Sequence, residues 1–217
     1  MMALSFSRLS TFEQCETKFD HLYVAKDVAD TDNEYSIYGN RVHEALELYA
    51  KGEAPLTAET LQYKSLVDSL LARPGDKHFE LQMAIRADKS PCDWFAKDVW
   101  LRGIGDVVII NEDSAFVGDY KTGKVKDNPT QLLLFACMIM ALFPKVQTVK
   151  TAFIWLAHNE VTDSRFTRDR LDQMWMTLLP RFEAVQDAVD LGVFRSKPSG
   201  LCNWCPAKDI CPDRKRR

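Results

Sequence analysis

Two neighbouring stretches decide the fold: Gly103-Ile104-Gly105-Asp106-Val107-Val108-Ile109-Ile110, followed by Phe116-Val117-Gly118-Asp119-Tyr120-Lys121. Both are short apolar runs of the kind that form buried β-strands, and each carries a carboxylate. Because side chains alternate along a strand, Asp119 and Lys121 should lie on the same face. If the two runs form an antiparallel hairpin around the polar segment between them, Asp106 and Asp119 lie at comparable distances from the turn and converge.

The flanking sequence predicts further strands and helices. Three consecutive strands, then a helix and another strand, indicate a mixed sheet flanked by helices, an α/β fold with helical additions at both ends. Strands are expected over Phe79–Ile85, Trp100–Ile110, Ala115–Tyr120 and Val149–Leu156; helices are expected from a Ser10 cap with Glu13 as its capping box, from near Ile37 to Gly52, and over Thr57–Ala72, Pro129–Phe143 and Thr167–Leu191.

Length and composition bound the class of protein. The 217 residues suit one domain, and 46% hydrophobic with 27% charged residues is a globular balance, neither disordered nor fibrous. The longest apolar run, Leu132–Phe143, is shorter than the ~20 residues that cross a bilayer, so no membrane association is expected. Met1–Arg8 lacks a secretory signal, which favours the cytoplasm. The net charge of -3 means that any nucleic acid must be bound by a local basic surface.

The paired carboxylates indicate metal chemistry. Magnesium and manganese prefer hard oxygen ligands, which Asp106, Asp119 and the backbone carbonyl of Tyr120 would supply. A lysine beside such a site can orient water and offset charge in the transition state of phosphate-ester hydrolysis. An isolated D-x-K is more often a surface ion pair. The apolar strands around both acids and the turn Lys121-Thr122-Gly123-Lys124 favour the site.

Cysteines mark a second centre. Cys202, Cys205 and Cys211 form a C-x2-C-x5-C run in a segment after Phe194 that has no apolar periodicity. In a cytosolic protein such clustered cysteines are more often metal ligands than disulfides, and Cys15 is the candidate for a fourth position. Four cysteines suit either an iron-sulfur cluster or structural zinc, and spacing alone does not distinguish them.

The motifs together resemble the PD-(D/E)XK superfamily, and within it the RecB-like nucleases, which include the AddB nuclease domain and the CRISPR-associated RecB-like exonucleases. The resemblance covers nearly the whole chain and rests on five features in order: Ser7-Arg8-Leu9 before a helix with Cys15, Gly39-Asn40-Arg41-Val42-His43, Gly105-Asp106, Gly118-Asp119-Tyr120-Lys121-Thr122-Gly123, and Gln131. It implies a restriction-endonuclease-like sheet in one domain, with residues 1–78 as a helical part, 79–157 as the catalytic core, 158–194 as a long helix and 195–217 as a cluster-binding tail.

Carried over residue by residue, the resemblance implies roles for individual side chains. His43, Asp106 and Asp119 would bind the metal, and Lys121 would serve the attacking water. Gln131 lies on the family's Q-x-x-x-Y helix, although Phe135 stands where the tyrosine is usual. Glu80 matches an acid that many relatives carry between the histidine and the first aspartate, and the resemblance implies that Glu80 and Gln131 belong to the catalytic residues with Asp106, Asp119 and Lys121. Without the other motifs, His43 would be read as a histidine of the core.

The resemblance also implies a 4Fe-4S cluster held by Cys15, Cys202, Cys205 and Cys211, with structural zinc as the alternative. The expected function is therefore a Mg- or Mn-dependent DNA exonuclease in the cytoplasm of a bacterial or phage-infected cell, acting in DNA recombination, repair or phage DNA processing. Its expected partners are DNA and recombination or repair proteins. The competing hypothesis is a catalytically inactive DNA-binding or scaffold module of the same fold.

Overall fold

The computed structural model describes residues 2–30, 33–126 and 128–214. It divides into two compact units: the first comprises residues 1–3 with 33–175, and the second comprises residues 4–32 with 176–217. The last three residues of the expected cluster-binding tail lie outside the described residues. The subdivision expected at residues 78, 157 and 194 stays a prediction.

The first unit is built on a five-stranded mixed sheet in the order β1-β2-β3-β4-β5. Neighbouring strands are antiparallel except β3 and β4, which are parallel. The predicted α/β architecture with a mixed sheet and flanking helices is confirmed. The strands are β1 (Asp76–Ile85), β2 (Leu101–Asn111), β3 (Ser114–Lys121), β4 (Thr148–Trp155) and β5 (Glu160–Thr167).

Strand β5 was missing from the sequence prediction, which placed four strands and then a helix from Thr167. The helix α6 (Leu171–Leu191) begins four residues later. The segment Glu-Val-Thr-Asp-Ser-Arg-Phe-Thr carries only two apolar residues, and Val161 is exposed. As an edge strand it is held by backbone pairing with β4, so it needs little apolar patterning.

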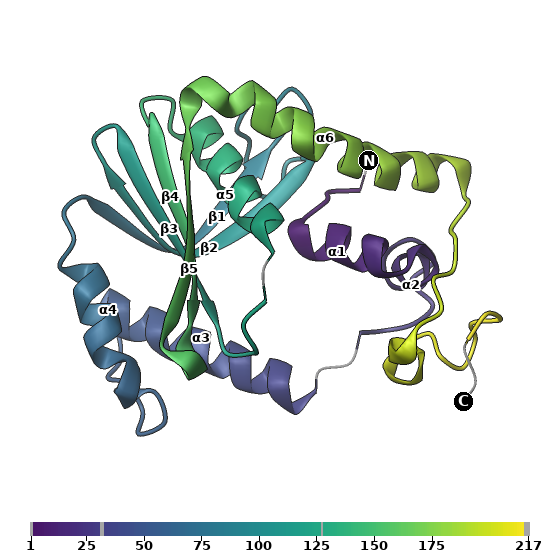
Figure 1. Cartoon of the computed structure of the whole chain (residues 1–217), viewed down its shortest axis with the longest axis horizontal. Helices are drawn as coiled ribbons and strands as arrows, with labels where there is room; N and C mark the ends of the chain where they lie inside the picture. The colour runs from purple at the N-terminus through teal and green to yellow at the C-terminus, as the bar shows by residue number, and fades with distance from the viewer. Residues whose placement is uncertain (1, 31–32, 127, 215–217) are drawn as a thin grey trace. The chain divides into compact units, whose positions relative to one another are not determined.

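Helices cover both faces of the sheet (Figure 1). On one face lie α3 (Glu34–Lys51) and α4 (Lys64–Leu71), and on the other lies α5 (Pro129–Leu142). A shared core joins α3 and α4 to the sheet through Val42, Leu46, Val67, Leu70, Val107, Ile109, Tyr120 and Ile154. Leu132 of α5 packs instead against Phe153 and Trp155, whose side chains alternate with Ile154 along β4.

The ends of these helices depend on specific caps. Helix α3 begins earlier than the expected Ile37, because the Asn33 side chain accepts hydrogen bonds from the Tyr35 and Ser36 amides. It ends at Gly52 as predicted, where the left-handed φ of 75° favours glycine. The helix expected over Thr57–Ala72 is shorter, since it starts with a 3-10 turn at Leu61–Tyr63.

The second unit contains α1 (Phe6–Gln14), α2 (Glu16–Phe19), the π-helical turn Asp20–Val24 and the 3-10 turn Gly200–Trp204. The predicted Ser10 cap is wrong: Ser5 caps α1 by accepting from the Arg8 amide, and Ser10 lies inside the helix. Glu13 does not complete a capping box but forms an ion pair with Arg181 at 2.6 Å. No helix among the described residues is long and apolar enough to cross a membrane.

Candidate active site

The site lies where β2 and β3 separate. Their antiparallel pairing runs from Asn111 opposite Ser114 to Val107 opposite Gly118 and ends there. Beyond that point β2 continues along β1, and β3 continues along β4. The predicted hairpin is confirmed, and its open end places the two aspartates on either side of a gap between strands.

Where the backbone pairing between β2 and β3 ends, a side chain accepts the next hydrogen bond from β3. The Tyr120 N–H donates to Asp106 Oδ2 at 2.6 Å, so the carboxylate takes the place of the backbone carbonyl that would accept this hydrogen bond in a continuous sheet. In a strand, the N–H and C=O of one residue point to the same neighbour, so the Tyr120 carbonyl faces the same opening. Gly118 allows the strands to approach just before they part, since a Cβ there would lie 2.7 Å from Val107 Cγ1.

Three potential ligands converge on this opening from three elements. His43 comes from α3, Glu80 from β1 and Asp106 from β2, and one ligand atom of each lies within 4.8 Å of the others. His43 Nδ1 is 3.3 Å from Asp106 Oδ2. The pairs Phe79–Val107 and Leu81–Gly105 flank Glu80, which puts it opposite Asp106 on the neighbouring strand.

The backbone of Glu80 is unusual. Its φ is 50°, in the left-handed region that residues other than glycine seldom adopt. Such conformations cost free energy and persist where surrounding structure enforces them, which is common at functional sites. Here the distorted residue is the one that supplies a carboxylate to the cluster with His43 and Asp106.

Asp119 forms a second group beside the first. It is buried, and Gln131 Nε2 donates to its Oδ1 at 2.9 Å while Lys121 Nζ lies 2.6 Å from its Oδ2. The Lys121 ammonium also sits over the Phe153 ring, 5.2 Å from its centroid. The predicted alternation is therefore observed: Asp119 and Lys121 share one face of β3, and Gln131 reaches them from α5.

Burial and neighbouring charges shift the pKa values of Glu80, Asp119 and His43. Burial, together with the charges of Asp106 and Glu47, raises the pKa of Glu80 to about 7. Burial also raises the pKa of Asp119 to about 6, although the Lys121 charge opposes this shift. For His43, burial disfavours the charged form, but the hydrogen bond and charge of Asp106 outweigh it and raise the pKa.

This donor set fits a divalent cation. Two carboxylates and an imidazole within one small space are ligands that divalent metals accept, and a cation there would offset the negative charge of Asp106 that adds to burial in raising the pKa of Glu80. Lys121 places one positive charge beside the second group. The arrangement can therefore hold a metal next to a lysine and a buried aspartate.

The structure brings together all six side chains that the sequence nominated for the active site, but it groups them differently from the expectation. Glu80, expected only as a catalytic acid, lies with His43 and Asp106. Asp119, expected as a metal ligand, contacts Lys121 and Gln131. Sequence reasoning missed Phe153 beneath the lysine; its place beside Asp119 in the parallel β3–β4 register is the signal that would have found it.

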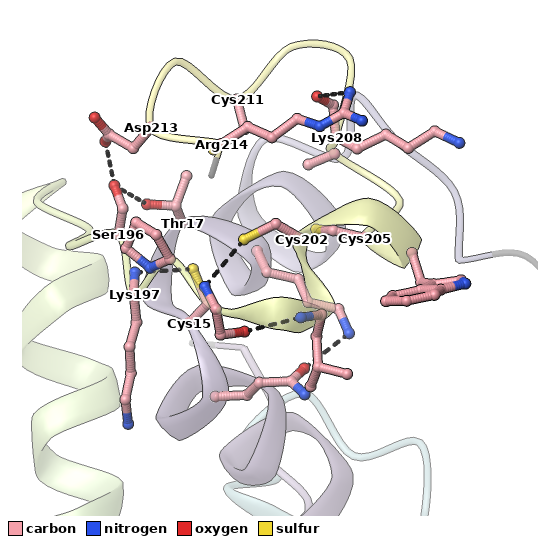
Figure 2. A pocket seen from close by; sticks show the side chains of 17 residues that line it. Cys15, Thr17, Ser196, Lys197, Cys202, Cys205, Lys208, Cys211, Asp213 and Arg214 are labelled. Atoms are coloured by element: carbon pink, nitrogen blue, oxygen red, sulfur yellow. Dashed lines mark hydrogen bonds between the residues drawn. The ribbon is translucent and has the colours of Figure 1, made fainter. Parts of the chain in front are cut away.

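The second unit contains a pocket of about 190 Å³ whose lining includes all four cysteines nominated from the sequence. Figure 2 shows Cys15 beneath the turn that carries Cys202 and Cys205, with Cys211 on the loop that follows. Backbone amides already point at two of the sulfurs: Lys197 N–H donates to Cys15 at 3.4 Å and Ser199 N–H donates to Cys202 at 3.2 Å. Among the described residues, no three cysteine sulfurs lie within 4.8 Å of one another.

The other two cysteines are not among the residues that line this pocket. Cys137 is fully buried in α5, as expected for a core residue, and burial raises the pKa of its thiol to about 12. Cys92 lies in the connection between β1 and β2.

Comparison with known proteins decides the family. Residues 3–212 match the family model of the PD-(D/E)XK nuclease superfamily. The chain belongs to this superfamily. The sequence Asp119-Tyr120-Lys121 has the D-x-K pattern of the superfamily's name, and members of the superfamily typically use divalent metals.

Two solved structures share the fold. SSO0001 is similar with a TM-score of 0.53 and 13% identity, over 99% of this chain and 88% of that protein. A protein of Eubacterium rectale, described as a putative exonuclease, is similar with a TM-score of 0.54 and 12% identity, over 99% of this chain and 90% of its own. Comparison with curated proteins gives no match.

Proposed function

We propose that this nuclease is a Mg- or Mn-dependent deoxyribonuclease that hydrolyses phosphodiester bonds at DNA ends. The observation that supports it best is the convergence of His43, Glu80 and Asp106 beside the Asp119–Lys121 pair at the gap between β2 and β3. A metal held there would polarise a phosphate oxygen and lower the pKa of bound water. The imidazole ligand favours manganese over magnesium, because imidazole suits transition metals better.

The remaining roles follow from the contacts of each side chain. Asp106 holds the Tyr120 amide and so keeps the Tyr120 carbonyl facing the metal ligands. Lys121, held by Asp119 at 2.6 Å, is placed to orient the attacking water and to offset negative charge on the phosphate. Gln131 fixes the Asp119 carboxylate from the other side, which limits its rotation.

The test uses DNA labelled at the 5' or the 3' end, single- or double-stranded, with Mn²⁺, Mg²⁺ or EDTA. Metal-dependent release of short products from one end supports an exonuclease, in keeping with the name of the Eubacterium rectale protein. Cleavage of circular DNA would instead indicate an endonuclease. Binding of DNA without cleavage under any metal would establish the alternative, an inactive DNA-binding or scaffold module.

We also propose that Cys15, Cys202, Cys205 and Cys211 hold a 4Fe-4S cluster. All four line one pocket, and two of the sulfurs accept backbone hydrogen bonds, a contact that tunes iron-sulfur centres. A tetrahedral zinc with bonds of about 2.3 Å would need sulfurs about 3.8 Å apart, and no three cysteine sulfurs of the described residues lie within 4.8 Å of one another. Iron, sulfide and zinc analysis of anaerobically purified protein separates the two metals.

The proposed setting is the cytoplasm, where thiolate ligands stay reduced, with DNA recombination, repair or phage DNA processing as the process. Recombination or repair proteins are its proposed partners. Pull-down from cells with and without damaged DNA tests this association, and recovery of no such protein would contradict it.

A further inference from the structure

The connection between β1 and β2 presents aromatic side chains to solvent. Phe95 is 84% exposed, an unusual exposure for so large an apolar group, and Trp94 precedes it. The Arg102 guanidinium lies 5.2 Å from the Trp94 ring centroid and 5.9 Å from that of Phe95. Its Nε is buried and has no hydrogen-bond partner among the described residues. Two rings and a cation thus form one small cluster, here named the aromatic platform.

The platform stands on a connection pinned by hydrogen bonds. The Cys92 amide donates to the Ala84 carbonyl at 3.0 Å, which ties the start of the loop to β1. Arg86 donates to Asp98 at 2.7 Å and to the Pro91 carbonyl at 2.6 Å, bridging both sides of the loop. The exposure of Phe95 is therefore a property of an ordered loop.

The platform is continuous with the metal ligands along β2. A Cβ on Gly103 would meet Met138 of α5 at 3.1 Å, so Gly103 faces α5 and its neighbours Arg102 and Ile104 face away from that helix. Asp106 also lies on the side away from α5, since its carboxylate is 3.3 Å from His43 of α3, and Ile104 between Arg102 and Asp106 is 38% exposed. The four steps along the strand from Arg102 to Asp106 span about 13 Å, which an extended single strand of DNA covers in roughly two nucleotides.

We propose that Trp94, Phe95 and Arg102 form a stacking platform for the bases of a single DNA strand, about two nucleotides from the phosphate that is cleaved. This proposal rests on the proposed nuclease function. Aromatic rings stack on bases of any sequence, and arginine adds attraction both to the base faces and to phosphate. Bases within a duplex do not expose their faces, so the platform selects single-stranded or frayed ends.

The first test measures affinity for a fluorescent oligothymidylate by anisotropy in EDTA, where no cleavage occurs. Phe95→Ala should weaken binding about 5- to 150-fold, the range expected for loss of base stacking. Phe95→Trp should restore it, whereas Phe95→Leu, which keeps apolar surface without a ring, should not. Val161→Ala is the control, because Val161 is also exposed but lies on β5, at the other edge of the sheet. Unchanged affinity for Phe95→Ala would overturn the proposal.

The second test locates the contact. Oligonucleotides carrying one 5-iododeoxyuridine at successive positions from a non-cleavable phosphorothioate are irradiated in the presence of the protein. The crosslink should form at roughly the second nucleotide and map to Trp94 or Phe95, and a crosslink to another segment would overturn the placement.

A small substrate separates this proposal from the nuclease function. Thymidine 5'-monophosphate p-nitrophenyl ester carries no base that reaches the platform, so Phe95→Ala should hydrolyse it as fast as the unchanged protein does. If the unchanged protein cleaves neither this ester nor DNA, the proposed function fails, while strand binding still tests the platform. If the unchanged protein is a dimer and Phe95→Ala is a monomer with unaltered DNA affinity, the aromatic surface is a subunit interface and the proposal is wrong.

Discussion

Replacing Glu80 by glutamine should stabilise the metal-free protein. Burial and the nearby charges raise the pKa of Glu80 from 4.5 to about 7, so the folded state binds its proton more tightly than the unfolded state does. Ionised Glu80 therefore destabilises the fold above about pH 7, and this penalty disappears as the pH falls toward about 4.5. A fully buried carboxyl with this pKa difference between the folded and unfolded states would lose roughly 3 kcal/mol, but Glu80 is only partly buried, and solvent screening reduces the penalty to about 1.5 kcal/mol.

For a chain of 217 residues, this free energy corresponds to about 3–6 °C in melting temperature. Thermal unfolding in EDTA at about pH 8 should show Glu80→Gln melting higher by that amount, and the difference should vanish near pH 4.5. Saturating Mn²⁺ should reverse the order, because the variant lacks one of the proposed ligands and gains less from the metal.

The matched control is Glu44→Gln, which makes the same charge change at an exposed residue next to His43. It should alter neither the melting temperature in EDTA nor the gain with Mn²⁺. A Glu80→Gln protein that is less stable than the unchanged protein in EDTA at about pH 8, or that gains as much from Mn²⁺, would refute the reasoning.

Three further predictions concern the other proposed ligands and the lysine. Asp119→Ala and Lys121→Ala should each lower metal-dependent DNA cleavage at least about 100-fold with an unchanged circular dichroism spectrum, and near-normal turnover by either would remove it from the mechanism. His43→Ala should raise the Mn²⁺ concentration for half-maximal activity at least about tenfold; an unchanged metal titration would make His43 a residue of the core. Cys15→Ala should abolish a broad absorbance near roughly 400 nm and lower the melting temperature, whereas Cys137→Ala should keep the colour; stoichiometric zinc without iron would contradict the cluster.

The strands that the sequence predicted best are those with continuous apolar runs. Residues 107–109 of β2 and 117–120 of β3 are buried on both faces of the sheet, so their apolar runs identify the strands, and α5 is predicted by its long apolar stretch. β5 was not predicted because it is held by backbone pairing with β4, and its own residues show no apolar pattern. The start of α1 was misplaced because Ser5 and Ser10 both suit a cap, and only the packing of the helix distinguishes them.

In the site, too, the features that depend on local sequence were predictable, and those that depend on strand register were not. Asp119 and Lys121 share a strand face by alternation, which is local and was predictable. The closeness of Glu80 to Asp106 depends on the β1–β2 register across a 15-residue connection, and no local pattern fixes that register. The separation of β2 from β3 also depends on tertiary structure. The sequence therefore gave no sign that the Tyr120 amide donates to Asp106.

The hydrogen bond from the Tyr120 amide to Asp106 makes this amide a spectroscopic reporter of the site. Its N–H donates to Asp106 Oδ2 at 2.6 Å, whereas the pairing of β3 with β4 is between backbone groups. A proton donated to a carboxylate is deshielded, and its chemical shift changes when that carboxylate turns toward a bound metal. One ¹⁵N-labelled resonance of the backbone would thus follow occupation of the site in real time, without substrate, dye or substitution.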